Sequence, residues 1–158
     1  MATAPRIINV LTVIDTETLL NKYQNETTTE ATPATIEDSV AQATIHMIAS
    51  TGDSINGSDS YELNVKGYVD DNVRWRAVSI SENTVNKVEF YNFIKSNDNE
   101  PKVINQPEEI PSSTGNYWQA TLIKEGTETY HWSFKIKDRS GKASVYLNWD
   151  PYITVKNP

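Results

Sequence analysis

Two β-strands are predicted near the end of the chain by Val145-Tyr146-Leu147-Asn148-Trp149-Asp150-Pro151-Tyr152-Ile153-Thr154-Val155. Val145, Leu147 and Trp149 alternate with more polar neighbours, and this period of two is typical of a half-buried strand. Pro151 has no backbone N–H to donate, so it ends the first strand and the second begins after it. The segment indicates an all-β fold and by itself predicts no catalytic activity.

Further strands are predicted upstream of this segment. Ile7 to Ile14 is apolar on both faces, as expected for a central strand, and residues 130–136 alternate most cleanly. Weaker patterns predict strands at 41–48, 61–65, 73–81, 88–94 and 118–122. Eight or nine strands in one chain favour an antiparallel two-sheet β-sandwich of jelly-roll or Greek-key type, with a closed barrel as the alternative.

One strand shows an interrupted pattern. Val73, Trp75 and Ala77 alternate, but the apolar positions then shift to Val78 and Ile80. One extra residue in the strand would produce such a shift, so we expect a β-bulge there.

One short helix is expected directly after the first strand. Thr16 to Tyr23 has helical character, and Asp15 is placed to cap its first turn. Residues 25–35 are polar and rich in threonine, and residues 96–115 contain three prolines, so both predict long loops.

Composition restricts the class of protein. The 158 residues predict a single domain over 1–158, and no segment resembles a transmembrane helix or a secretory signal. The absence of cysteine fits a reducing compartment, so we expect a cytoplasmic protein. The net charge of −7 disfavours nucleic acid and anionic membranes as partners, because both would repel it.

Charge is distributed unevenly along the chain. Residues 121–158 carry six basic and four acidic side chains, a net charge of +2, which leaves −9 for residues 1–120. Patches of opposite sign would favour head-to-tail association of copies, although a solvated surface explains the same pattern.

No catalytic or metal site is predicted. His46 and His131 lie far apart in the sequence, with no carboxylate or serine placed to make either a base, and the loop from Asp53 to Asp59 lacks the spacing of an EF-hand. Neither a phosphate-binding loop nor a dinucleotide motif occurs, and no cofactor is implied. We therefore expect a protein that is not an enzyme.

Aromatic residues leave sugar binding as a possible chemistry. Trp75, Trp118, Trp132 and Trp149 lie in phase with aliphatic neighbours, which predicts core packing for all four. The candidate ligand-binding residues lie instead on polar faces or at strand ends, where rings stack on sugars and carboxylates or amides bind hydroxyls. They are Asp15, Asn148, Asp150 and Tyr152.

Three segments together resemble the AidA and PixA family of bacterial inclusion body proteins. They are Val13 to Leu20, Val73 to Ser81 and Asn148 to Ile153, and their order spans nearly the whole chain. The resemblance implies a small cytoplasmic bacterial protein, made at high level under quorum-sensing or growth-phase control. The inclusion proteins that define the family are rich in methionine, whereas this chain has only Met1 and Met47, which argues against sulfur storage.

Two hypotheses of different class follow. The first is a non-enzymatic protein that associates with itself as a dimer or larger assembly. The family resemblance and the exposed edge strands of an open sandwich support this hypothesis. The second is a lectin-like module that binds a glycan at the candidate residues, with or without help from calcium.

Overall fold

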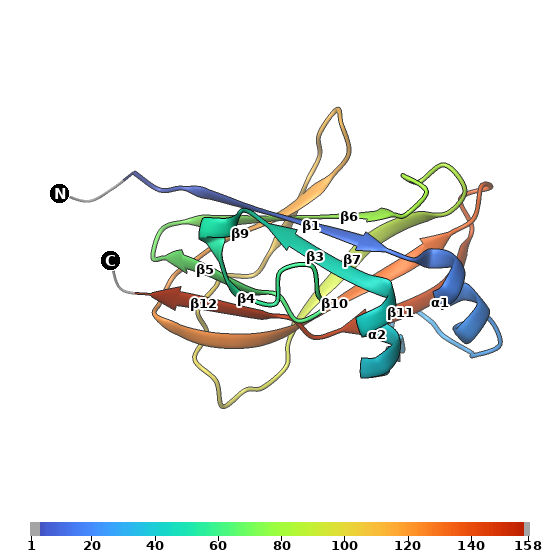
Figure 1. Cartoon of the computed structure of the whole chain (residues 1–158), viewed down its shortest axis with the longest axis horizontal. Coiled ribbons are helices and arrows are strands. Elements are labelled where there is room, and N and C mark those ends of the chain that lie inside the picture. The colour runs from blue at the N-terminus through green and yellow to red at the C-terminus, as the bar shows by residue number, and fades with distance from the viewer. Residues whose placement is uncertain (1–3, 157–158) are drawn as a thin grey trace.

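The computed structural model describes residues 4–156, and within them the chain forms two packed β-sheets. Figure 1 shows β1 and β6 in the upper layer, above β10, β11 and β12 in the lower one. The two-sheet β-sandwich predicted from the sequence is confirmed.

The first sheet has five strands in the order β3-β1-β6-β9-β8. β1 lies inside the sheet, as predicted, and pairs with β3 in antiparallel and with β6 in parallel orientation, but only one of its two faces is buried. The strands are β1 (Ile7–Ile14), β3 (Ile45–Ala49), β6 (Asn72–Ser79), β8 (Glu108–Ile110) and β9 (Tyr117–Thr121).

The second sheet has seven strands, six of them in the order β2-β11-β10-β12-β5-β4 and β7 paired with β10. β11 and β12 both pair with the long strand β10, and Pro151 separates them as expected. The strands are β2 (Ala34–Thr35), β4 (Ser54–Asn56), β5 (Asn64–Tyr68), β7 (Lys87–Lys95), β10 (Gly126–Lys137), β11 (Ala143–Trp149) and β12 (Tyr152–Lys156).

Two details of the predicted architecture are wrong. The residues described contain two α-helices, α1 (Thr16–Tyr23) and α2 (Asp38–Thr44), together with the short 3-10 helix η1 (Thr51–Asp53), where one helix was expected. Three strand pairs are parallel, namely β1 with β6, β2 with β11 and β5 with β12. α2 occupies the start of the predicted strand 41–48, because Ala41 and Thr44 are buried at a helical spacing that alternation does not reveal.

The core is aromatic where the two sheets face each other. Trp75, Trp132 and Trp149 are fully buried, and Phe90 stacks on Trp132 with ring centroids 4.5 Å apart. Burying each large side chain contributes about 1.5–3 kcal/mol. The predicted packing role is therefore confirmed for three tryptophans, whereas Trp118 is only half-buried.

The bulge predicted in residues 73–81 is wrong. β6 pairs with β1 in unbroken register from Asn72 to Ser79, and Ser79 is buried in phase with Val73 and Trp75. Val78 and Ile80 therefore belong to the outer face of the five-stranded sheet. An actual bulge lies in β7, where the register shifts opposite Ser133 and Phe134.

Candidate functional site

The four candidate residues do not form one site. Asp15 caps α1, accepting hydrogen bonds from the Thr18 backbone N–H at 3.1 Å and from the Thr18 hydroxyl at 2.8 Å. Its carboxylate is thus engaged in the local structure. The predicted capping role is confirmed, and a role in ligand binding stays a prediction.

Asn148 lies on the outer face of the seven-stranded sheet, where it is half-buried and pairs with Thr35 of β2. Close by, the Thr28 hydroxyl accepts from the Tyr146 backbone N–H at 3.0 Å. The Oδ1 atom of Asn148 is buried and has no hydrogen-bond partner among the described residues. A role of Asn148 in ligand binding stays a prediction.

Asp150 and Tyr152 do lie together, at the corner between β11 and β12. Burial raises the pKa of the Tyr152 hydroxyl, and the nearby carboxylates of Glu62 and Asp150 raise it further. Tyr152 lines an open recess of about 480 Å³ with Asn56, Gly57, Ser60, Glu62 and Asn64, which we call the polar recess. One ring among amides and a carboxylate is a combination that suits a polyhydroxy ligand.

A second concavity was not foreseen from the sequence. It lies between residues 75–78 of β6, residues 87–90 of β7 and the β8–β9 hairpin, and has a volume of about 250 Å³. We call it the side cleft. Trp118 forms part of its wall and packs edge-on against the buried Trp132, with ring centroids 5.4 Å apart. The sequence signal for this cleft is Trp118 itself, whose alternation with Ala120 predicted core packing; Trp118 does pack against the core but is only half-buried.

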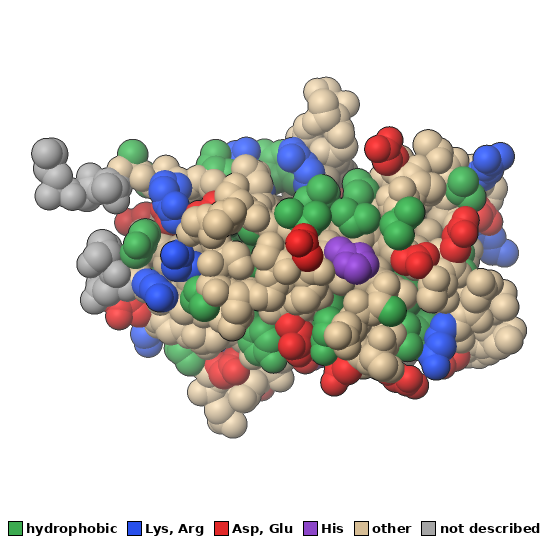
Figure 2. All heavy atoms as spheres, in the orientation of Figure 1, with side chains coloured by type: hydrophobic (Ala, Val, Ile, Leu, Met, Phe, Trp, Pro, Cys, Tyr) green, Lys and Arg blue, Asp and Glu red, His purple; other side chains and the backbone are tan. Residues whose placement is uncertain are grey.

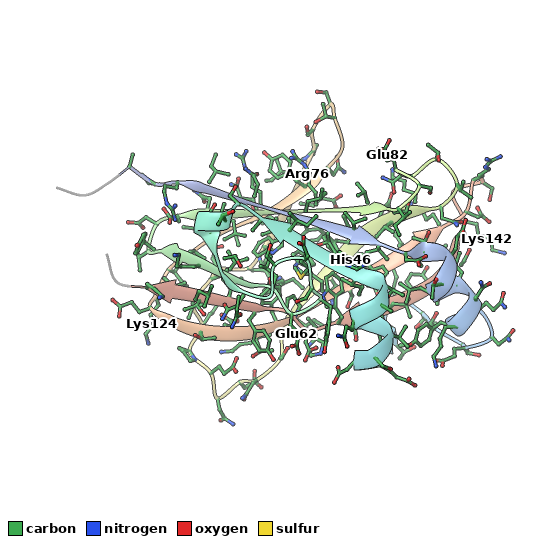
Figure 3. The ribbon with its side chains drawn as sticks, viewed as in Figure 1. His46, Glu62, Arg76, Glu82, Lys124 and Lys142 are labelled. Atoms are coloured by element: carbon green, nitrogen blue, oxygen red, sulfur yellow. The ribbon has the colours of Figure 1, made fainter. Side chains whose placement is uncertain are left out.

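Charged groups around the side cleft balance one another. Arg76 and Lys87 contribute two positive charges, and Glu89 and Glu109 contribute two negative ones. Figure 3 labels Arg76 near the base of the β8–β9 hairpin, where its guanidinium lies 5.0 Å from the Tyr117 ring centroid. Such balance disfavours a strongly charged ligand.

A third feature is the outer face of the five-stranded sheet. Leu11 of β1 and Ile48 of β3 are directly paired neighbours, and nearly two fifths of the surface of each residue is exposed to solvent. Val13 and Val78 form the next pair along, and Ile80 is 61% exposed. We call these five residues the apolar face. Figure 2 shows green side chains gathered beside the purple His46 on this side of the molecule.

The histidines do not complete a catalytic constellation within residues 4–156. His46 Nδ1 lies 3.2 Å from the Asp59 carbonyl oxygen. His131 Nδ1 lies 2.5 Å from the exposed Ser96 hydroxyl, but no described carboxylate bonds to the other ring nitrogen to orient it. No group of three potential metal ligands is found among these residues, nor does any helix in them have the length and apolarity needed to cross a membrane.

Comparison with known proteins supports the fold and the family. The structure is similar to the crystal structure of a PixA inclusion body protein from Burkholderia cenocepacia J2315, with a TM-score of 0.86 and 17% sequence identity, over 99% of this chain and 98% of that one. No curated protein matches the sequence. The family model for PixA, described as inclusion body protein, matches residues 6–115 and 94–155, and the chain therefore belongs to the PixA inclusion body protein family.

Proposed function

We propose that the protein associates with itself and accumulates in the cytoplasm as a non-enzymatic inclusion body protein, expressed like AidA under quorum-sensing or growth-phase control. Membership of the PixA family supports accumulation. The observation that carries self-association is the apolar face, because large exposed apolar patches on soluble proteins mark interaction sites.

The outermost strands β2, β3, β4 and β8 give less support to self-association than the face does. The outer edge of β3 is covered, since Met47 N–H donates to the Ser60 carbonyl and Asp59 N–H donates to the Met47 carbonyl. β4 and β8 have three residues each and β2 has two. Short or covered edges are how proteins prevent strand-to-strand pairing between copies. Copies therefore meet through side chains of the apolar face.

Paired threonine substitutions test the apolar face. The double variant Leu11→Thr/Ile48→Thr places a β-branched residue, which suits a strand, at both positions and leaves the net charge unchanged. It removes apolar contact area from the face. We expect the dissociation constant of the assembly, measured by sedimentation velocity over a concentration series, to rise about tenfold or more.

The matched control is Ile94→Thr. Ile94 is 48% exposed on β7, away from the apolar face, so its replacement should leave the dissociation constant unchanged. An equal effect of both variants would mean that general surface hydrophobicity, and not this face, drives association. A wild-type protein that stayed monomeric at high concentration would overturn the proposal.

Glycan binding at the polar recess is the second candidate function. It is supported by the Tyr152 ring, which shares the recess with Asn56, Asn64 and Glu62. A glycan array probed with and without calcium tests it, with Tyr152→Ala as the variant that should lose any signal. Signals that persisted in Tyr152→Ala would place the glycan elsewhere, and a blank array would remove the candidate.

A further inference from the structure

The side cleft is bordered by two open strand edges, one from each sheet. β6 pairs with β1 over its whole length, but with β9 only from Asn72 to Trp75. Within the described residues β7 pairs with β10 alone. The second half of β6 and the outer side of β7 thus present backbone groups to the cleft, where no strand of the chain lies.

Hydrogen bonds at the end of the cleft show which backbone groups face it. Ser79 N–H and Val88 N–H both donate to Asn83 Oδ1, at 3.2 and 3.3 Å, and therefore point away from β1 and β10. Residues two apart in a strand present their N–H and C=O to the same side. Ala77 and Phe90 consequently direct their backbone groups into the cleft, and both residues line it.

The Asn83 side chain occupies the position of a peptide group between the two edges. Its carboxamide oxygen bridges one N–H of β6 and one N–H of β7, and its own backbone N–H donates to the Ser79 hydroxyl at 2.9 Å. One step further into the cleft, no described strand pairs with Ala77 or Phe90 on the cleft side, and their N–H groups make no hydrogen bond outside the strand ladders. Backbone groups removed from water are nearly always paired, so this arrangement calls for an amide ligand or water.

We propose that the side cleft binds an extended segment of another protein, two or three residues long, whose main chain pairs with the free edges at Ala77 and Phe90. Strand addition of this kind derives affinity from main-chain hydrogen bonds and selectivity from side-chain contacts. The half-buried Trp118 provides the surface for one apolar side chain of the segment. The four charges of the lining sum to zero, so the segment carries uncharged side chains.

The charged groups of the lining already have partners. Glu89 lies 3.4 Å from Lys87 and 2.8 Å from Lys137, and Asn116 donates to Glu109 at 2.9 Å. A charged ligand would have to displace these contacts, whereas an uncharged peptide leaves them in place. The volume of about 250 Å³ fits a short segment and is small for a larger folded element.

A peptide titration followed by NMR tests the proposal on the intact protein. The probe is acetyl-Thr-Val-Thr-amide, and its matched control carries a methyl group on the valine nitrogen, which removes one donor. With ¹⁵N-labelled protein, the probe should shift the amide signals of Ala77 and Phe90 and the indole signal of Trp118 in a saturable way. Methylation should weaken binding about tenfold, the effect of losing one buried hydrogen bond.

Variants locate the site on the protein. In Ala77→Pro the outward N–H is lost while the N–H groups that point to β1 remain, so probe affinity should fall about tenfold. Ile123→Thr, at an exposed position after β9, is the control and should leave affinity unchanged. The methylated probe removes a different bond of the same main-chain pairing, the one that the peptide N–H donates to a protein carbonyl, and it does so in wild-type protein, so a misfolded proline variant does not decide the result.

Three outcomes overturn the proposal. The first is equal affinity for both probes, because main-chain pairing would then be absent. The second is saturable shifts confined to residues outside the cleft. The third is movement of the cleft signals on raising the protein concentration without probe, since the occupant would then be a second copy of this chain. None of these results bears on the apolar face, which its own variants test.

Discussion

At the scale of single residues, Asp71 connects the start of the chain to the β5–β6 turn. Its carboxylate accepts from the backbone N–H groups of Arg6 and Tyr68 at 2.9 and 3.0 Å, and from the Arg6 guanidinium at 3.2 Å. We expect Asp71→Asn to lower the free energy of unfolding at pH 7 by about 1–3 kcal/mol, because strong acceptor bonds are lost. Urea unfolding followed by tryptophan fluorescence measures this. Asp70→Asn, at the exposed neighbouring position, should change it by less than about 0.5 kcal/mol.

The same carboxylate predicts a pH dependence of stability. Burial alone would raise the pKa of Asp71, but the hydrogen bonds from Arg6 and Tyr68 outweigh it and lower the pKa overall. A folded-state pKa below the unfolded value of about 3.9 stabilises the protein above that pH, and the stabilisation is lost as the pH falls further. The difference in free energy of unfolding between wild type and Asp71→Asn should therefore become smaller below about pH 4 in the same urea experiment. A difference that stayed constant down to pH 2.5 would show that the pKa of Asp71 is not lowered in the folded protein.

The sequence patterns predicted a helix cap more accurately than they predicted the solvent exposure of a side chain. Asp15 was identified as a helix cap from its position before Thr16, because the side chain acts on its own next turn. Asn148 was expected on the polar face of its strand, and it is half-buried there, with its Oδ1 atom enclosed and without a hydrogen-bond partner among the described residues. Local alternation indicates the face on which a side chain lies but not how far the rest of the fold encloses it, so the candidate site could not be predicted in full.

At the scale of elements, α1 depends on its cap. The helix has only eight residues, a length that is marginal without favourable ends. Asp15→Ala should lower the free energy of unfolding by about 1 kcal/mol, whereas Asp15→Asn should keep most of the cap and lose only a few tenths. Urea denaturation midpoints of the three proteins measure the difference. Equal urea midpoints for Asp15→Ala and wild type would show that the packing of Leu19 and Tyr23 stabilises the helix without the cap.

Strand phase was predicted well only where one face is polar. In β10 the buried Tyr130, Trp132 and Phe134 alternate with polar residues, and the predicted inward face is correct. In β6 the outward Val78 is apolar as well, and so is Ile80 directly after the strand, so alternation could not distinguish inward from outward residues and a bulge was inferred wrongly. The failure of the pattern coincides with the apolar face, which is the surface proposed for association.

At the scale of the whole molecule, the parallel pairs lay beyond prediction from the sequence. β5 pairs with β12 although nearly ninety residues separate Asn64 from Tyr152, and β2 pairs with β11 over a longer separation. Such pairings arise from packing of the complete sandwich. The number and alternation of strands predicted two layers, but not which strands lie next to each other.

The net charge of the whole chain sets how association should respond to salt. At pH 7 each copy carries −7, so copies repel one another, and salt screens that repulsion over a Debye length of about 10 Å at 0.1 M. If the apolar face drives association, raising NaCl from 0.05 to 0.5 M at pH 7.5 should strengthen association, and so should lowering the pH toward the pI of about 4.8.

Head-to-tail attraction between the +2 and −9 parts of the chain would instead weaken with salt. Sedimentation velocity at both salt concentrations separates the two mechanisms, and Leu11→Thr/Ile48→Thr should remain the weaker associating protein at each. Association that fell as salt rose, with the double variant unaffected, would show that copies meet through oppositely charged groups and not through the apolar face.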